Sequence, residues 1–198
     1  MKKFSCEDAM HRIRSFYQPV DEGVRDSLIN FMVIADRLNV ATTESCHGHV
    51  DWIFSYPTIS FDVKHVHQRR VPIWNVYQRY KRYTNKREIN ANLKKRVEDS
   101  IFFLTREIIQ FHQDDKTDPH LFFSVIRTNG FSFRIVAAFP NYSRGLRKAG
   151  MWSELEELMT KQRAVLIRLS EFILGRVEGI TSLDGTNRCS CDVCRIKH

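Results

Sequence analysis

Apolar residues recur every three or four positions in three stretches of this chain, and this spacing is typical of one face of an α-helix. The three predicted helices are Asp21–Leu38, Glu88–His112 and Trp152–Leu174. Asn39 and Gly175 follow the first and the last of them, and both residue types commonly end helices. Shorter helices are predicted over Phe4–Tyr17, before Pro19, and over Pro72–Tyr83.

Other stretches have the two-residue alternation, or the β-branched and aromatic content, of strands. They are Val40–Thr43, Trp52–Phe54, Thr58–Val63, Leu121–Ile126 and Phe131–Phe139. The dipeptide Asn129-Gly130 lies between the last two and is a strong signal for a tight turn. These two strands are therefore expected to form a hairpin.

The order of the predicted elements is not a regular alternation of strand and helix, and the chain has no internal repeat. We therefore expect an α+β fold, a single domain whose sheet is mostly antiparallel and whose helices pack mainly on one face. The apolar periodicity stops after Gly175. The expected division is a domain over residues 1–175 and a cysteine-rich tail over residues 176–198.

The composition places the protein among ordinary globular chains. Hydrophobic residues make up 42% and charged residues 27% of its 198 residues. No apolar run approaches the roughly 20 residues that span a bilayer, and the first residues lack the apolar stretch of a signal peptide. Five cysteines, three of them near the C-terminus, do not suit a secreted disulfide framework. We expect a cytoplasmic protein without a membrane partner.

The positive charge is concentrated in one region. The whole chain has a net charge of +8, but Lys64–Arg96 alone carries eleven lysines and arginines against one acid, Glu88, a local net charge of +10. Such a field attracts polyanions. Nucleic acid is the common case, and a nucleotide or an acidic protein partner are the alternatives.

Aromatic residues are interleaved with the cations of this region. Aromatic side chains stack on bases while arginine and lysine neutralise phosphates, so the pattern suits RNA or single-stranded DNA. The candidate binding residues are Arg69, Arg70, Trp74, Arg79, Lys81 and Arg82. The alternative is a solvated helix whose aromatic residues pack inward.

The run TTESCHGHV gathers a thiol, two imidazoles and a hydroxyl in one short segment. Cys46 is a candidate nucleophile, activated by His47 or His49. Cys46 and a histidine are alternatively candidate metal ligands. Ser45 and Gly48 suit a loop that binds an anionic ligand through its amides. A polar turn in which Cys46 is buried as a small apolar residue would also explain the run.

The longer run NVATTESCHGHV resembles the T-T-S-S-C-x-G-R run of the tRNA wybutosine-synthesising methyltransferase family. The matching positions are Thr42, Thr43, Ser45, Cys46 and Gly48. The run is also similar to an S-C-x-G-H loop of small uncharacterised phage and bacterial proteins, in which His49 matches. Over residues 21–63 the resemblance implies an α+β domain with a site at this loop and, for the methyltransferases, S-adenosylmethionine and a tRNA substrate. His49 stands where that family has arginine.

The last ten residues hold four soft metal ligands: Cys189, Cys191, Cys194 and His198. Zinc takes four such ligands in a tetrahedron, and short loops let one segment supply several of them. Cys46, His47 or His49 are alternative fourth ligands, which would attach the tail to the earlier loop. The same residues are also compatible with an iron–sulfur cluster or with a tail that carries free thiols.

Three functional hypotheses follow from these patterns. The first is a small metal-binding protein, of phage or mobile-element origin, that binds nucleic acid or a nucleotide through a basic face. The second is an RNA-modifying, methyltransferase-like enzyme centred on residues 45–49. The third is a protein inhibitor that acts through its basic surface. The chain has no phosphate-binding glycine loop, no H-E-x-x-H and no G-x-S-x-G, which weakens kinase, dehydrogenase, metalloprotease and α/β-hydrolase hypotheses.

Overall fold

A computed structural model of the protein describes residues 22–47, 56–63 and 86–178. The elements are α2 (Glu22–Arg37), β1 (Ala41–His47), β2 (Pro57–Asp62), α5 (Lys86–Asp115), the short 3₁₀ helix η1 (Pro119–Leu121), β3 (Phe123–Arg127), β4 (Ser132–Ala137), α6 (Pro140–Lys148) and α7 (Trp152–Glu178). The strands form one antiparallel sheet in the order β1-β2-β4-β3. The predicted α+β class, the antiparallel sheet and the hairpin of β3 and β4 are confirmed.

Several predicted elements fall on other parts of the chain. They are the helices Phe4–Tyr17 and Pro72–Tyr83, the strand Trp52–Phe54 and the cysteine-rich end of the tail, all of which lie outside the described residues. Within the described ranges, none of the helices is both long enough and apolar enough to cross a membrane.

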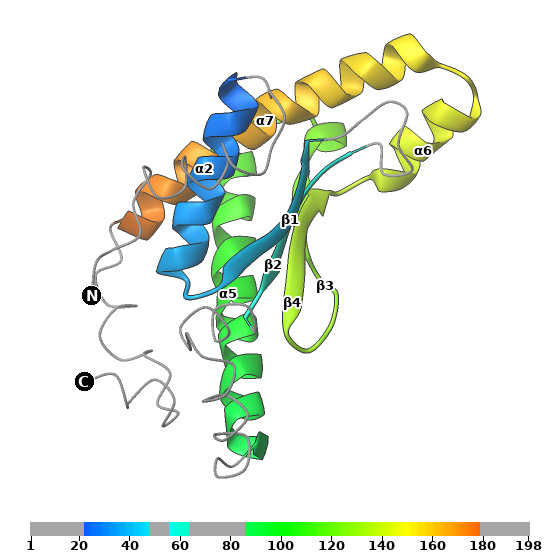
Figure 1. The fold of residues 1–198 in the computed structure, drawn as a ribbon. Coiled ribbons are helices and arrows are strands. Elements are labelled where there is room, and N and C mark those ends of the chain that lie inside the picture. Colours follow the sequence, from blue (N-terminus) through cyan, green and yellow to red (C-terminus); the bar gives the residue numbers. More distant parts are fainter. Residues whose placement is uncertain (1–21, 48–55, 64–85, 179–198) are drawn as a thin grey trace.

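Helices α2, α5 and α7 lie on the same face of the sheet, as predicted (Figure 1). α2 contacts β1, α7 contacts β2, and α5 contacts β3 and β4. The alternate residues Ile59, Phe61, Phe133 and Ile135 of the two central strands are fully buried against these helices. Alternation places every second side chain of a strand on one face, so this face of the sheet forms one wall of the main core.

A stacked pair of phenylalanines lies at the centre of that core. Phe61 on β2 and Phe133 on β4 are paired in register, and their ring centroids are 4.9 Å apart with an interplanar angle of 15°. Phe31 from α2 meets Phe61 edge-on at 6.5 Å. The sheet and α2 are thus joined by aromatic contacts between side chains with no exposed surface.

Asn39 ends α2, as predicted. Its φ is 59°, in the left-handed region that asparagine tolerates better than most residues. The amide of Val40 donates to the carbonyl of Ala35 at 2.8 Å, which satisfies one of the carbonyls left open at the helix end. The chain then enters β1 directly.

Strand β1 is longer than predicted and includes part of the TTESCHGHV run. Thr42 pairs with Phe61 and Ser45 with Ile59, so three steps along β1 match two steps along β2. One extra residue is therefore inserted as a β-bulge. The predicted strand Val40–Thr43 covers only the start of β1, because the bulge interrupts the two-residue period beyond it.

The last helix also continues further than predicted, and the predicted end at Gly175 is wrong. α7 runs through Gly175 to Glu178. A glycine inside a helix costs about 1 kcal/mol, but Val177 beyond it is buried in the main core. Burial of an aliphatic side chain contributes about 1.5–3 kcal/mol, which exceeds that cost.

Helix α6 was not predicted at all. It has few apolar residues, and Leu146 and Ser143 are its buried side chains. Leu146 packs with Leu155, Leu158 and Met159 of α7 in a small second core. So short a helix is marginal alone in water, and its packing on α7 supplies a stabilisation that local sequence does not reveal.

Two exposed glycines near the end of α6 are expected to respond oppositely to alanine. A Cβ on either Gly145 or Gly150 would meet no atom within 4 Å, but Gly150 has a φ of +69°. Gly145→Ala should raise the free energy of unfolding by about 0.5–1 kcal/mol, because alanine favours the helix. Gly150→Ala should lower it by about 1–2 kcal/mol, because alanine is strained at this φ. Urea unfolding of both variants measures the two shifts, and equal signs would contradict the assigned backbone conformations.

Candidate nucleic-acid interface

The structure places Ser45 and Cys46 near the end of β1 and on opposite faces of the sheet. Ser45 pairs with Ile59, on the face that carries the helices, and Cys46 pairs with Thr58, on the other face. Both side chains are half-buried, and Cys46 is a free thiol. Gly48 and His49 lie outside the described residues, so the predicted nucleophile–base pair and the anion-binding loop remain predictions.

The predicted metal ligands Cys189, Cys191, Cys194 and His198 lie outside the described part of the chain. His47 is the last residue of β1 and pairs with Pro57. Among the residues that the structure describes, no group of three or more histidine, cysteine, aspartate or glutamate side chains is arranged to hold a metal ion. The zinc prediction therefore depends on the tail.

The basic region is described only at its end, where it becomes α5. The candidate residues lie outside the described residues, between the ranges 56–63 and 86–178: Arg69, Arg70, Trp74, Arg79, Lys81 and Arg82. Lys94 and Lys95 follow on α5 and are both exposed. Figure 1 shows the first turns of α5 extending beyond the ends of the strands. Lys94 and Lys95 follow those turns and belong to the last part of the basic region Lys64–Arg96.

Contacts with the sheet position this first part of α5. A Cβ added to Gly130 would lie 3.3 Å from Cε of Lys94, so the lysine stem lies close against the turn between β3 and β4. The guanidinium of Arg127 on β3 contacts the carboxylate of Glu98 at 3.3 Å. The guanidinium of Arg96 donates to the carbonyl of Asn39 at 3.5 Å. These contacts hold the lysine-bearing segment at a fixed angle to the sheet.

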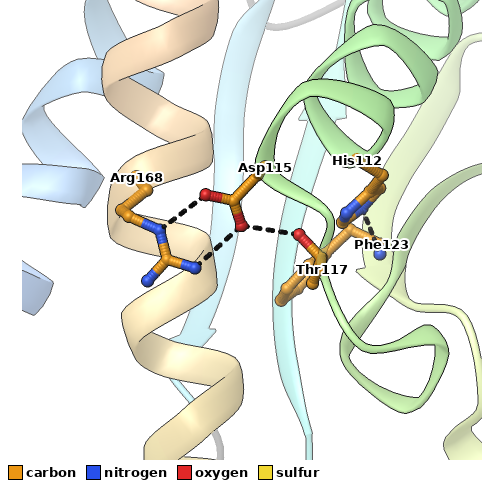
Figure 2. A network of polar contacts seen from close by, with 5 residues as sticks. All are labelled: His112, Asp115, Thr117, Phe123 and Arg168. Atoms are coloured by element: carbon orange, nitrogen blue, oxygen red, sulfur yellow. Dashed lines mark hydrogen bonds and ion pairs between the residues drawn. The ribbon is translucent and has the colours of Figure 1, made fainter.

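A second polar cluster joins the far end of α5 to α7 and β3 (Figure 2). Asp115 accepts hydrogen bonds from Arg168 on α7, at 3.3 Å from Nε and 2.9 Å from Nη2. The Thr117 hydroxyl donates to the same carboxylate at 2.7 Å. One turn earlier, Nε2 of His112 accepts from the amide of Phe123 at 2.9 Å. The cluster thus fixes where α5 stops and β3 starts.

The His112 ring is buried and stacks on Phe122 with centroids 4.3 Å apart. Because Nε2 is an acceptor, the neutral ring carries its proton on Nδ1, which has no hydrogen-bond partner among the described residues. Burial lowers the pKa of His112, and the neighbouring Asp115 carboxylate opposes this shift. The Arg168 and Thr117 hydrogen bonds lower the pKa of Asp115. At neutral pH these pKa shifts keep His112 neutral and Asp115 charged, as expected for residues that connect α5 to its neighbours.

A third surface, on α6, was missed from the sequence. Phe139 and Tyr142 are large exposed hydrophobic residues, and Arg144 and Lys148 are exposed cations on the same helix. The available signal was a run without any aspartate or glutamate from Pro119 to Ser153, which contains five arginines and lysines. The higher charge density of the earlier basic region obscured it.

Comparison of the chain with models of known protein families, with curated proteins and with solved structures finds no match. The function of the protein is therefore inferred from its residues and from their arrangement.

Proposed function

We propose that the protein binds nucleic acid through a basic surface that begins in Lys64–Arg96 and continues onto α5. The observation that carries this proposal is the exposure of Lys94 and Lys95 on α5, at the end of a region with a local net charge of +10. Exposed lysines on a rigid helix neutralise phosphates and release condensed counterions, which supplies most of non-specific nucleic-acid affinity.

The sheet supports this role by restraining the helix. Lysine side chains on an ordered helix lose less backbone freedom on binding than lysines on an unstructured segment, so more of the electrostatic free energy remains for affinity. The burial of Leu93 and Val97 in the main core and the hydrogen bond from Arg96 to Asn39 provide that order.

The test is the salt dependence of binding to fluorescently labelled RNA and single-stranded DNA, measured by anisotropy. Charge reversal in Lys94→Glu/Lys95→Glu is expected to weaken binding at low salt by about tenfold or more. It should also reduce the slope of log K against log salt by about 1.4, which is about 0.7 for each single-strand phosphate that is no longer neutralised.

The matched control is Lys94→Arg/Lys95→Arg, which keeps both charges and should bind like the wild type. Circular dichroism and thermal unfolding establish that the reversed variant is folded, as expected for exposed positions. If the wild-type protein fails to bind nucleic acid at about 50 mM salt, the proposal is wrong. Binding of an acidic protein would then be the better explanation of the charge.

We further propose that zinc is bound by the cysteine-rich tail, with Cys46 as one alternative fourth ligand. Metal analysis of protein purified without chelators is expected to find about one zinc per chain. Cys191→Ser should abolish zinc binding. Loss in Cys46→Ser as well would indicate that β1 and the tail share the ion, whereas retention there would assign the fourth position to another residue. Absence of zinc in the wild type would reject the site.

A further inference from the structure

Three aromatic side chains form an exposed cluster where η1 meets the start of α6. The rings of His120 and Tyr142 stack with centroids 5.2 Å apart and an interplanar angle of 30°. Phe139 meets His120 edge-on at 6.0 Å. Tyr142 keeps 47% and Phe139 46% of its surface exposed, although both are large and apolar. Such a cluster on a surface is typical of a binding site.

Cations lie beside this cluster along α6. Arg144 and Lys148 are four residues apart, so they lie on one side of the helix, and both are exposed. Gly145 lies between that side and Tyr142, and a Cβ there would meet no atom within 4 Å, so the surface between ring and cations is open. No acidic residue occurs on α6 or in the turn that follows it.

The fold holds this surface in place. The Asp118 side chain accepts from the amide of His120 at 2.9 Å and so caps η1. Leu121 of η1 and Leu146 of α6 pack with the same residues of α7. The aromatic rings are therefore carried by two short helices that share one small core, and little conformational entropy is lost when a ligand binds them.

We infer that this stacking surface, formed by His120, Phe139, Tyr142, Arg144 and Lys148, binds the unpaired bases of a single-stranded nucleic acid. Tyr142 extends its stack with His120 onto a base, while Arg144 and Lys148 contact the phosphates on either side. An aromatic ring stacks on any exposed base, whereas the bases of a duplex present their faces only to each other. The inference rests on the proposed nucleic-acid binding and adds to it a preference for single strands.

The stacking surface is separate from the lysines of α5. Figure 1 shows α6 and the first turns of α5 at opposite ends of the molecule. The α5 lysines attract any polyanion, and the α6 surface selects one whose bases are accessible. The two surfaces are therefore distinguishable by mutation.

The first test compares Tyr142→Ala with Tyr142→Phe. The ligands are labelled oligonucleotides of about 12 nucleotides, as uridine RNA, thymidine DNA and a duplex. Tyr142→Ala is expected to weaken single-strand binding by about 5- to 150-fold, the value of one stacked base, and to leave duplex binding unchanged. Tyr142→Phe keeps the ring and should bind like the wild type. A difference in affinity between uridine RNA and thymidine DNA would show which of the two single strands the surface prefers.

The second test places a negative charge in the middle of the surface. Gly145 is exposed, a Cβ there would meet no atom within 4 Å, and glutamate favours the helix over glycine, so Gly145→Glu should fold at least as well as the wild type. It is expected to weaken single-strand binding by about two- to fivefold at low salt, and less at high salt. The matched control Gly145→Gln has nearly the same shape without the charge and should bind like the wild type.

The outcomes separate this inference from the proposed function. If the wild type binds neither single strands nor duplex, both fail. If it binds them and Lys94→Glu/Lys95→Glu weakens both, but Tyr142→Ala changes neither or weakens both equally, the stacking surface alone is rejected. Polyglutamate tests for recognition of charge alone: if it competes with uridine RNA as strongly as unlabelled RNA does, the inference is overturned.

Discussion

Phe133→Ala is expected to lower the free energy of unfolding by about 3–5 kcal/mol, a large effect for a single substitution. The Phe133 ring has no exposed surface and stacks on Phe61 at 4.9 Å between the two central strands. Alanine removes the buried apolar area and leaves a cavity that the paired strands β2 and β4 restrain from collapsing. Urea unfolding followed by circular dichroism measures the loss.

The matched control is Phe102→Ala on α5. Phe102 is the same residue type, but 72% of it is exposed, so its replacement should change the free energy of unfolding by no more than about 0.5 kcal/mol. Phe133→Leu keeps part of the volume and should lie between the two. If Phe102→Ala were as destabilising as Phe133→Ala, the main core would not lie between the sheet and the helices.

His112→Ala is expected to lower the free energy of unfolding by about 2–4 kcal/mol at neutral pH. The substitution leaves the buried amide of Phe123 without its acceptor and removes the ring that stacks on Phe122. His120→Ala, at an exposed histidine, is the control and should cost no more than about 0.5 kcal/mol. A small effect of His112→Ala would mean that Phe123 finds another acceptor.

The same histidine predicts a pH dependence of stability. Burial lowers the pKa of His112 in the folded state, so below its ordinary value near 6.5 the unfolded chain binds the proton more readily. The stabilisation is therefore complete above about pH 7 and is lost as the pH falls below 6.5 toward the lower folded-state pKa, by at most about 1.4 kcal/mol per pH unit.

His112→Gln isolates this contribution, because glutamine offers an acceptor for the Phe123 amide and does not titrate. The difference in unfolding free energy between wild type and His112→Gln should shift against the wild type as the pH falls from about 7.5 to about 5. The other histidines are common to both proteins and cancel. A difference that stays constant over this range would show that burial does not lower the pKa of His112.

The distribution of charge gives the molecule two different surfaces rather than one basic face. Lys94 and Lys95 lie at the end of the dense basic region, whereas Arg144 and Lys148 accompany exposed aromatic rings on α6. The first arrangement suits electrostatic attraction over a range of about 10 Å. The second requires contact, because stacking acts only between touching rings. Under the function proposed above, the first surface would attract a strand and the second would hold its bases.

Local sequence patterns are sufficient to predict the long elements of this fold. In α2 and α5, apolar residues recur at helical spacing over several turns, and the repeated burial of one face makes that signal strong. The hairpin of β3 and β4 was also predictable, because Asn129-Gly130 marks a turn between two strand-like segments. The connection is longer than a two-residue turn, since the last strand pair is Arg127 with Phe133. The side chain of Asn129 accepts from the amide of Phe131 at 2.7 Å, a local contact of the kind that sequence encodes.

The tertiary structure decided the elements whose stability comes from distant partners. α6 is stabilised by the packing of Leu146 on α7. α7 continues through Gly175 because Val177 is buried in the main core. β1 accommodates its bulge because it pairs with β2 both before and after the bulge. The stacking of His120 on Tyr142 joins residues from two separate short helices. The spacing of apolar residues shows which face of a single helix or strand is buried, but not which other elements cover that face. The proposed stacking surface depends on how η1 and α6 meet, and the small core that they share with α7 fixes that arrangement.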